Sequence, residues 1–257
     1  MLKTAIQAAK EAGTYLREAF KRIDSLAYAY KDTYSIVTEA DTQSEEIILR
    51  ELKNAFPDHA FFGEESGKDG KESDFLWVID PLDGTSNFSR KIPYFCISIG
   101  LIHQGKQTLG VVYQPIFDEL FTAEIGKGAY CNGEKISPRA EGELKKAIAV
   151  LSRGTKEDVK NRFWNTLAKT DDAIKSIRVE GAVALDLAYT ACGRFDALIS
   201  YGCNIYDYTA GCVIAHEAGA RVTDFRGNDW SPKSNEVLVA NSSLHTEFVR
   251  LFKNKIL

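Results

Sequence analysis

A buried strand that runs directly into paired carboxylates constrains the fold of this chain more than any other segment. Residues 76–79 are all apolar and predict a short buried strand, which the chain leaves through Asp80-Pro-Leu-Asp83. Proline fixes φ and favours a tight turn, so we expect both aspartates to fold back toward one point in space. Two carboxylates held together repel strongly unless a cation lies between them.

The residues that follow this turn favour an anion as the neighbour of that cation. Gly84 lets the backbone approach a ligand closely, and a helix beginning at Thr85 would direct N–H groups toward an anion. A divalent metal beside a phosphate is the simplest interpretation of the combination. The alternative is an Asp-rich type I turn that binds nothing, and these residues alone leave it open.

Composition excludes several classes of protein. The 257 residues suffice for one large domain or two closely packed halves, and 44% hydrophobic with 26% charged residues is ordinary for a soluble globular enzyme. With a net charge of −4 and a pI near 5.7, the chain lacks the excess positive charge that is typical of proteins binding nucleic acid or an anionic membrane. An acidic protein that handles phosphate must neutralise its charge locally, which again favours a bound metal.

The cysteines and the N-terminus favour a cytoplasmic location. The five cysteines are odd in number and form no CxxC pair, so we expect small buried side chains in a reducing compartment rather than a disulfide framework. The first residues lead into an amphipathic stretch without the pattern of a signal peptide. The longest uncharged run, 92–105, is too short to span a bilayer.

Hydrophobic periodicity predicts mixed secondary structure in the first half of the chain. Helical spacing covers residues 2–23, and a second helix is expected from an N-cap at Thr38 to just before Pro57. Short strands are predicted at 28–31, 59–62 and 75–79, with an exposed loop at 67–72. Apolar runs separated by turn signals predict an antiparallel meander over 94–136, with strands at 95–102, 109–113, 120–123 and 129–130.

The second half alternates strands with helices and predicts an α/β layer. Strands are expected at 147–151, 175–179, 197–199, 220–223 and 236–240, and helices at 157–169, 182–192, 207–218 and 243–253. We expect a single domain spanning 1–257, with halves of roughly 1–140 and 141–257 that meet at 137–146.

Four further acidic residues stand in suggestive contexts. Glu64 and Glu65 end a predicted strand before an open loop, and Asp41 and Asp207 lie near predicted helix starts. Solvated surface charge is the ordinary explanation for such glutamates, and a favourable interaction with the helix dipole is the ordinary one for such aspartates.

Taken together, these segments resemble the inositol monophosphatase family, a group of Mg²⁺-dependent, lithium-sensitive phosphatases. The resemblance is carried by Gly63-Glu-Glu-Ser-Gly67, Asp80-Pro-Leu-Asp-Gly-Thr-Ser-Asn-Phe88 and Asp207-Tyr-Thr-Ala-Gly211, in this order and spacing. It continues nearly end to end through Ser35 to Asp41, Gly181 to Tyr189, Gly193 to Asp196 and His216 to Gly219. It implies a layered αβαβα sugar-phosphatase fold (α/β, or α+β), with an N-terminal antiparallel-sheet half and a C-terminal α/β half, and a homodimer.

The resemblance also implies a set of metal ligands. One Mg²⁺ ion would take Glu64, Asp80 and the Leu82 carbonyl, a second would take Asp80, Asp83 and Asp207, and a weaker third would again use Glu64. Oxygen ligands suit such hard cations, and the four histidines show no ligand spacing, so a zinc site is disfavoured.

The remaining site residues are likewise implied by the resemblance. Glu64 and Thr85 would orient and deprotonate the attacking water, and Asp41 would support the metal site or contact Thr85. Backbone N–H groups of Gly84 and Thr85 would hold phosphate oxygens, and Asp207 would also face the leaving oxygen. The predicted substrate contacts are Asp83, Gly84, Thr85, Gly181, Ala182, Ser200 and Asp207.

Departures from the family pattern concern the substrate. Tyr206 stands before Asp207 where the family usually has tryptophan, and Ser200 stands where inositol-binding members typically carry a glutamate. Gly181-Ala-Val183 replaces the usual Gly-Ser/Thr-Ala and removes a hydroxyl from the expected substrate wall.

The sequence leaves three candidate functions open. The leading one is metal-dependent hydrolysis of a small phosphorylated polyol or sugar of the inositol-1-phosphate type, with fructose-1,6-bisphosphate as the nearest alternative. A nucleotide 3′- or 2′-phosphate or histidinol phosphate would use the same metal core. A non-catalytic regulatory binding protein is the alternative from a different class, but such a protein need not retain every ligand.

Overall fold

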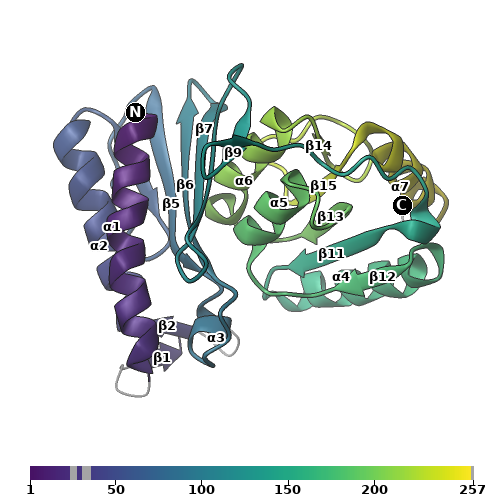
Figure 1. Cartoon of the computed structure of the whole chain (residues 1–257), viewed down its shortest axis with the longest axis horizontal. Helices are drawn as coiled ribbons and strands as arrows, with labels where there is room; N and C mark the ends of the chain where they lie inside the picture. Colours follow the sequence, from purple (N-terminus) through teal and green to yellow (C-terminus); the bar gives the residue numbers. More distant parts are fainter. Residues whose placement is uncertain (24–27, 31–35, 256–257) are drawn as a thin grey trace.

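The computed structural model describes residues 1–23, 28–30 and 36–255, and these form five layers in the order α-β-α-β-α (Figure 1). Helices α1 (Leu2–Lys21) and α2 (Glu39–Ala55) cover the outer face of a first sheet. Helices α5 (Val183–Ala191) and α6 (Ile205–Glu217) form the middle layer. Helices α4 (Glu157–Thr170) and α7 (Ser242–Lys255) cover the far face of a second sheet. The layered fold expected from the sequence is therefore confirmed.

The first sheet has eight strands in the order β10-β9-β8-β7-β6-β5-β3-β4. All its neighbours pair antiparallel except β3 and β5, which are parallel. The strands are β3 (Ala60–Gly63), β4 (Gly67–Lys68), β5 (Phe75–Asp83), β6 (Cys96–His103), β7 (Lys106–Gln114), β8 (Glu119–Glu124), β9 (Ala129–Cys131) and β10 (Glu134–Lys135). The predicted meander is thus present, and β4 occupies part of the predicted loop at 67–72.

Strand β5 is longer than the sequence indicates. We expected it to end at Ile79 and to enter a tight turn, but it continues to Asp83 with a shift of register: Asp80 pairs with Ser98 and Asp83 with Cys96. One extra residue on β5 makes this a bulge, and a bulge accommodates proline because it needs no ladder N–H there. The prediction of a turn was wrong because a bulge and a turn carry the same Pro and Asp signals.

The second sheet has five strands in the order β12-β11-β13-β15-β14. Strands β12, β11 and β13 are parallel to one another, whereas β15 runs antiparallel to β13 and β14. They are β11 (Ile148–Arg153), β12 (Ser176–Arg178), β13 (Ala197–Tyr201), β14 (Arg221–Thr223) and β15 (Glu236–Ala240). Between the sheets, residues 137–146 contain only the short 3₁₀ helix Leu144–Lys146, and the division of the chain there stays a prediction.

The N-terminal elements follow the predicted periodicity with small differences at their ends. Helix α1 buries a stripe of small and apolar side chains and ends at Lys21, two residues before the predicted end. The predicted strand at 28–31 corresponds to β1 (Tyr28–Tyr30), and Lys31 lies outside the described residues. Strand β1 pairs with β2 (Ile36–Thr38), which leads directly into α2.

Close packing of α6 on the first sheet fixes the position of its N-terminus. A Cβ atom at Gly110 of β7 would lie 2.3 Å from the Ala210 carbonyl oxygen of α6, so only glycine allows this approach. The Ser98 hydroxyl of β6 donates to the Tyr206 carbonyl oxygen at 3.2 Å. These contacts place the first turn of α6 beside the carboxyl end of β5.

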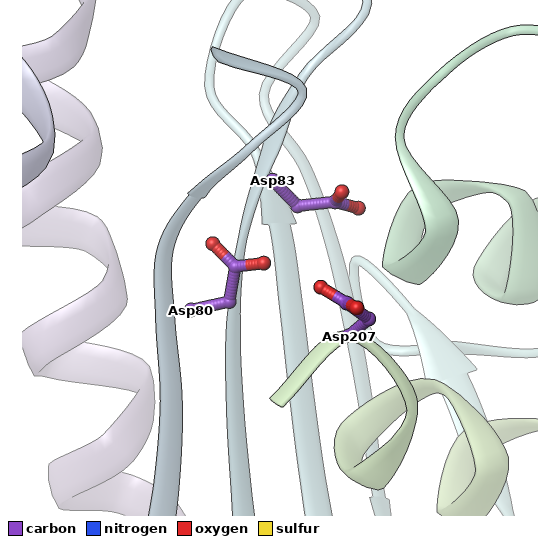
Figure 2. Close-up of side chains that lie close together, drawn as sticks. All are labelled: Asp80, Asp83 and Asp207. Carbon is purple, nitrogen blue, oxygen red and sulfur yellow. The ribbon is translucent and has the colours of Figure 1, made fainter. Parts of the chain in front are cut away.

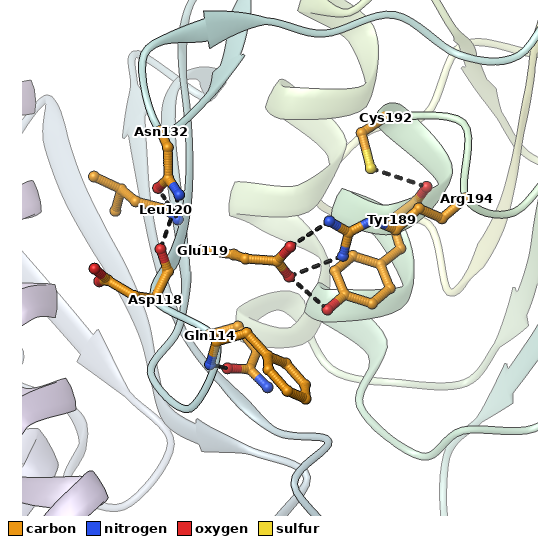
Figure 3. Close-up of polar contacts among 9 residues, drawn as sticks. Gln114, Asp118, Glu119, Leu120, Asn132, Tyr189, Cys192 and Arg194 are labelled. Carbon is orange, nitrogen blue, oxygen red and sulfur yellow. Dashed lines mark hydrogen bonds and ion pairs between the residues drawn. The ribbon is translucent and has the colours of Figure 1, made fainter.

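Polar contacts also join the first sheet to the end of α5 (Figure 3). The Glu119 carboxylate of β8 accepts hydrogen bonds from both terminal nitrogens of Arg194 and, at 2.7 Å, from the Tyr189 hydroxyl. The Arg194 guanidinium lies 4.2 Å from the centre of the Tyr189 ring, which adds a cation–π contact.

Two further expectations concern cysteines and membranes. The five cysteines are unpaired thiols. Among the described residues, no helix combines the length and the apolar character that crossing a bilayer requires.

Candidate active site

Three carboxylates converge where β5, α5 and α6 meet. Asp80 and Asp83 extend from β5 and Asp207 from the first turn of α6, and the side chains point into a common space (Figure 2). One oxygen from each lies within 4.8 Å of the others. Asp80 and Asp83 are buried, and Asp207 is half-buried. We call these three residues the acidic cluster.

Asp207 is held in place by the start of its own helix. Helix α6 begins at Ile205, two residues earlier than predicted, so Asp207 occupies the third helical position. Its carboxylate accepts the Asn204 N–H, while the Asn204 side chain accepts the N–H of Asp207, which together form a capping box. This local arrangement limits the orientations open to the carboxylate.

Asp83 is held by a helix distant in sequence. Its two carboxylate oxygens accept the N–H groups of Val183 at 3.0 Å and Ala184 at 2.6 Å, in the first turn of α5. The N-cap residue of α5, Ala182, has no side chain that could accept these N–H groups. Asp83 therefore serves as the side-chain cap of α5 and ties the first sheet to the middle layer.

Glu64 lies beside the cluster, next to Asp80. It directly follows β3, and its N–H donates to the Ile79 carbonyl oxygen at 3.0 Å. The charge of its carboxylate raises the pKa of Asp80, so the two side chains lie close together. Glu64 is nevertheless not one of the three residues whose oxygens all lie within 4.8 Å of one another. Glu65, the other glutamate of this motif, also follows β3 and donates its N–H to Glu45 at 2.9 Å.

The pKa values of the three carboxyl groups in the acidic cluster are all raised. Burial, together with the nearby charges of Glu64, Asp83 and Asp207, raises the pKa of Asp80 well above its usual range. Burial also raises the pKa of Asp83 to about 7, even though the backbone N–H groups of α5 oppose this shift. The pKa of Asp207 is raised by burial and by the charge of Asp83. The cluster therefore cannot carry its full negative charge at neutral pH without a cation.

An oxygen-only ligand set fits a hard divalent cation such as Mg²⁺. Among the described residues, the group of close ligand atoms contains carboxylates only and no histidine or cysteine, which disfavours zinc and softer metals. The Leu82 carbonyl, predicted as a further ligand, lies between Asp80 and Asp83 in the bulge and accepts the Thr85 hydroxyl at 3.0 Å. The oxygen atoms available here therefore suit magnesium.

Thr85 connects the bulge to α2. Its hydroxyl lies 2.8 Å from a carboxylate oxygen of Asp41 as well as 3.0 Å from the Leu82 carbonyl oxygen, so its one proton is shared between two acceptors. Thr85 begins the four-residue helix α3 (Thr85–Phe88), and Gly84 precedes it with a φ of 96°. That left-handed conformation favours glycine, and a Cβ there would also crowd the Tyr94 carbonyl oxygen at 3.0 Å.

One face of α2 supports the site, and we predicted only its first member. Asp41, Ser44 and Glu45 are all buried and follow helical spacing. The Ser44 hydroxyl donates to the Pro81 carbonyl oxygen at 2.8 Å, and Glu45 accepts the N–H groups of Glu65 and Ser66. The spacing of three polar residues at positions i, i+3 and i+4 was the available signal in the sequence.

The predicted substrate residues divide into two groups. Gly181 lies at the start of α5 beside Asn87 of α3, with a φ of 84°. By contrast, Ala182 is fully buried, and Ser200 is 1% exposed with its hydroxyl 2.9 Å from the Tyr208 hydroxyl. The roles of all three residues in binding substrate stay predictions.

Another buried carboxyl near the cluster, Asp186 of α5, was absent from the predicted set. It accepts the hydroxyls of Tyr94 and Ser152, each at 2.6 Å. Burial raises its pKa to about 8, although these two donors oppose the shift. An aspartate inside the apolar run Val183 to Ala191 was the sequence signal.

Comparisons with known proteins agree with this geometry. The family model described as the inositol monophosphatase family matches residues 1–257. The chain is 38% identical over 254 residues to inositol monophosphatase 2 of Solanum lycopersicum, with 95% of each chain covered. It is 36% identical to the Nus factor SuhB of Xylella fastidiosa, covering 92% of this chain and 88% of that one. A crystal structure of the extragenic suppressor protein suhB from Bartonella henselae superimposes with a TM-score of 0.94 at 34% identity, covering 99% of this chain and 98% of that one.

Proposed function

This chain belongs to the inositol monophosphatase family and is a phosphatase, and from that premise we propose that it hydrolyses small phosphorylated polyols or sugars with magnesium as cofactor. The observation that carries the proposal is the convergence of Asp80, Asp83 and Asp207 from two distant segments. Buried carboxylates this close together are unfavourable unless a cation compensates them. The nominal substrate class is a phosphomonoester of the inositol-1-phosphate type.

We assign the metal ligands to the residues around this convergence. Asp80 interacts with Glu64 as well as with Asp83 and Asp207, so it can contribute to two ion positions. The Leu82 carbonyl completes the first position. Magnesium bound here supplies positive charge that offsets the charge of the phosphate oxygens and eases deprotonation of water. Two or three ions are expected.

The activation of water falls to Glu64, Thr85 and Asp41. Asp41 accepts the Thr85 proton at 2.8 Å, which leaves the lone pairs of the Thr85 oxygen free to accept a proton from water. Glu64, beside Asp80, is the expected general base. Asp41 thus acts through Thr85 and has no direct contact with the reacting atoms.

Binding of phosphate is assigned to the backbone at Gly84 and Thr85. The first hydrogen bond of α3 runs from the Phe88 N–H to the Gly84 carbonyl oxygen, so the N–H groups before it have no partner within the helix. Gly84 directly follows Asp83, so this backbone adjoins the cluster. Asp207 is assigned to the side of the leaving oxygen, and Gly181, Ala182 and Ser200 to the substrate wall.

A phosphate-release assay tests the proposal. The full-length protein is given inositol-1-phosphate, fructose-1,6-bisphosphate, a nucleotide 2′- or 3′-phosphate and histidinol phosphate, each with magnesium and with a chelator. We expect magnesium-dependent release that is largest for a polyol or sugar phosphate. Asp83→Asn should abolish it, whereas Asp172→Asn, a change at an exposed residue away from the site, should not.

One alternative class of function would give a different result in the same assay. A relative carries the name Nus factor, and a regulatory binding protein with this fold could dispense with catalysis. Such a protein would release no phosphate from any of these esters with magnesium present. The presence of Glu64, Asp80, Asp83, Thr85 and Asp207 favours the enzyme.

We also expect the protein to be a homodimer and to be located in the cytoplasm. Light scattering of the purified protein measures its oligomeric state.

A further inference from the structure

A recess of about 700 Å³ lies beside the C-terminal half of α6, away from the acidic cluster. Its walls come from the first sheet, from α6 and from the segment around β14, and we call it the α6 recess. The residues that matter for its chemistry are Lys106, Gln107, Ile125, Val213, Arg221 and Trp230. None of the carboxylates of the acidic cluster lines it. Its volume lies within the range of small-molecule sites, roughly 300–1,000 Å³.

The floor of the α6 recess is apolar and well packed. Val213 and Trp230 are buried parts of the central hydrophobic core, and the Trp230 ring packs edge-on against Tyr208 with centroids 5.9 Å apart. Ile125, at the rim, is 48% exposed. Val213 and Trp230 are only 2% and 9% exposed, so a flat apolar group would gain mainly van der Waals contact from them and would remove chiefly the Ile125 surface from water.

Trp230 also provides an unsatisfied hydrogen-bond donor. Its indole N–H is buried and has no acceptor among the described residues. Buried donors without an acceptor are rare in folded proteins, because the group has lost its contact with water and gained nothing in exchange. Trp230 lines the recess, so an acceptor atom on a ligand could complete the N–H once the side chain moves to present it.

The rim of the α6 recess is positively charged, in contrast to the acidic chain as a whole. Lys106 makes no ion pair with any residue in the described part of the chain. Arg221 pairs with Asp229 at 3.7 Å, but both side chains are largely exposed, and such pairs are weak. An anionic group at this rim would meet two cations and a single carboxylate.

We propose that the α6 recess is a second ligand site, which binds a small amphipathic anion. The ligand combines a flat aromatic body, which covers the floor, with one anionic group held by Lys106 and Arg221 and with an acceptor for the Trp230 N–H. This assignment is independent of the phosphatase reaction, because it uses none of the residues placed in the active site.

The indole N–H signals of the ¹⁵N-labelled full-length protein give a direct test. The chain has three tryptophans, and Trp230→Phe assigns the resonance in question. The probe is 8-anilinonaphthalene-1-sulfonate, which is aromatic and carries one sulfonate. We expect it to bind saturably and to move the Trp230 proton signal downfield, while the signals of Trp77 and Trp164 stay in place.

Charge variants test the rim separately. Lys106→Gln and Arg221→Gln should each weaken binding of the probe about tenfold, as expected for loss of a charge-assisted contact. Arg226→Gln, a matched change at an exposed arginine outside the recess, should leave it unchanged. A Trp230 signal that does not move at millimolar probe, or equal weakening by all three variants, would overturn the proposal. A signal that shifts with protein concentration alone would also overturn it, because a second copy of the chain would then fill the recess.

Discussion

Two sets of buried carboxyl groups, Asp186 and the acidic cluster, lie near each other, and their surroundings differ. Asp186 receives two hydroxyl donors from the protein, Tyr94 and Ser152, and so has its hydrogen bonds completed within the chain. In the acidic cluster, Asp80 accepts the N–H of Leu82 at 3.1 Å and otherwise faces other carboxylates. Burial raises the pKa in both places, and like charges add to it in both. At Asp80 the charges of Glu64, Asp83 and Asp207 come directly after burial, whereas at Asp186 the two hydroxyl donors outweigh the charges of Asp83 and Glu180. Asp186 is therefore a structural group, whereas the cluster is incomplete without a cation.

A third arrangement sharpens the contrast. Glu119 is also partly buried, but its main partner is the Arg194 guanidinium, and this hydrogen-bonded pairing lowers its pKa (Figure 3). Neutral hydroxyl donors thus contact Asp186, other carboxylates lie around Asp80, and an oppositely charged guanidinium contacts Glu119. The chemistry of the nearest partner decides whether the group supports the fold or requires a ligand.

Asp80→Asn should show the largest effect. If the cluster holds magnesium, this change should lower kcat/KM by about 1000-fold or more, which corresponds to about 4 kcal/mol of transition-state stabilisation. In a chelating buffer the same change should raise Tm, because it replaces a carboxyl buried among like charges with a neutral amide. Activity assays and thermal melts measure the two effects, with Asp172→Asn as control. A fall in Tm together with retained activity would contradict the distinction between the two places.

Asp186→Ala should act on stability. It leaves the buried hydroxyls of Tyr94 and Ser152 without an acceptor, so we expect the free energy of unfolding to fall by about 2–4 kcal/mol. Asp186→Asn keeps one acceptor oxygen and should cost less. Denaturant unfolding measures both variants. Loss of magnesium affinity at unchanged stability would instead place Asp186 in the metal site.

The pH dependence of stability should separate the two places. In the folded state the pKa of Asp186 is about 8 and that of Asp83 about 7, both above the unfolded value of 3.8, so the fold retains protons that the unfolded chain releases. With a chelator present, stability should therefore fall as pH rises from about 4 to about 8, by about 1 kcal/mol per pH unit for each proton retained. Saturating magnesium should remove the pH dependence of stability that is due to Asp83. The substitution Asp186→Asn should remove the pH dependence that is due to Asp186. A flat profile in chelator would show that neither group is protonated in the fold.

Glu119→Gln should have the smallest effect. It weakens a contact with Arg194 that is partly exposed, so we expect a loss of about 1 kcal/mol at neutral pH. Since the pKa of Glu119 is lowered in the fold, the stabilisation is present above its unfolded pKa and is lost as pH falls through the folded one. Urea denaturation at neutral and acidic pH measures this, and Glu124→Gln in an exposed i,i+3 pair is the matched control.

Much of the fold could be read from local patterns. The meander from β6 to β9 and the alternation of strands and helices after β11 were predicted because apolar spacing and turn residues act within a few positions. The bulge in β5 was missed, since Pro81 between two aspartates fits a turn equally well. The supporting residues Ser44 and Glu45 and the buried Asp186 were also missed, because their partners lie far away in sequence.

The sequence by itself determined the order of the elements and the presence of an oxygen-rich motif suited to a hard cation. The family resemblance already placed Asp207 with Asp80 and Asp83, and the structure brings the three together. Only the tertiary structure decided that Asp83 caps a helix 100 residues later and that Asp186 is completed by hydroxyls. The reason is physical: the type of an element depends on neighbours along the chain, whereas the charge around a buried carboxylate depends on which elements pack against it.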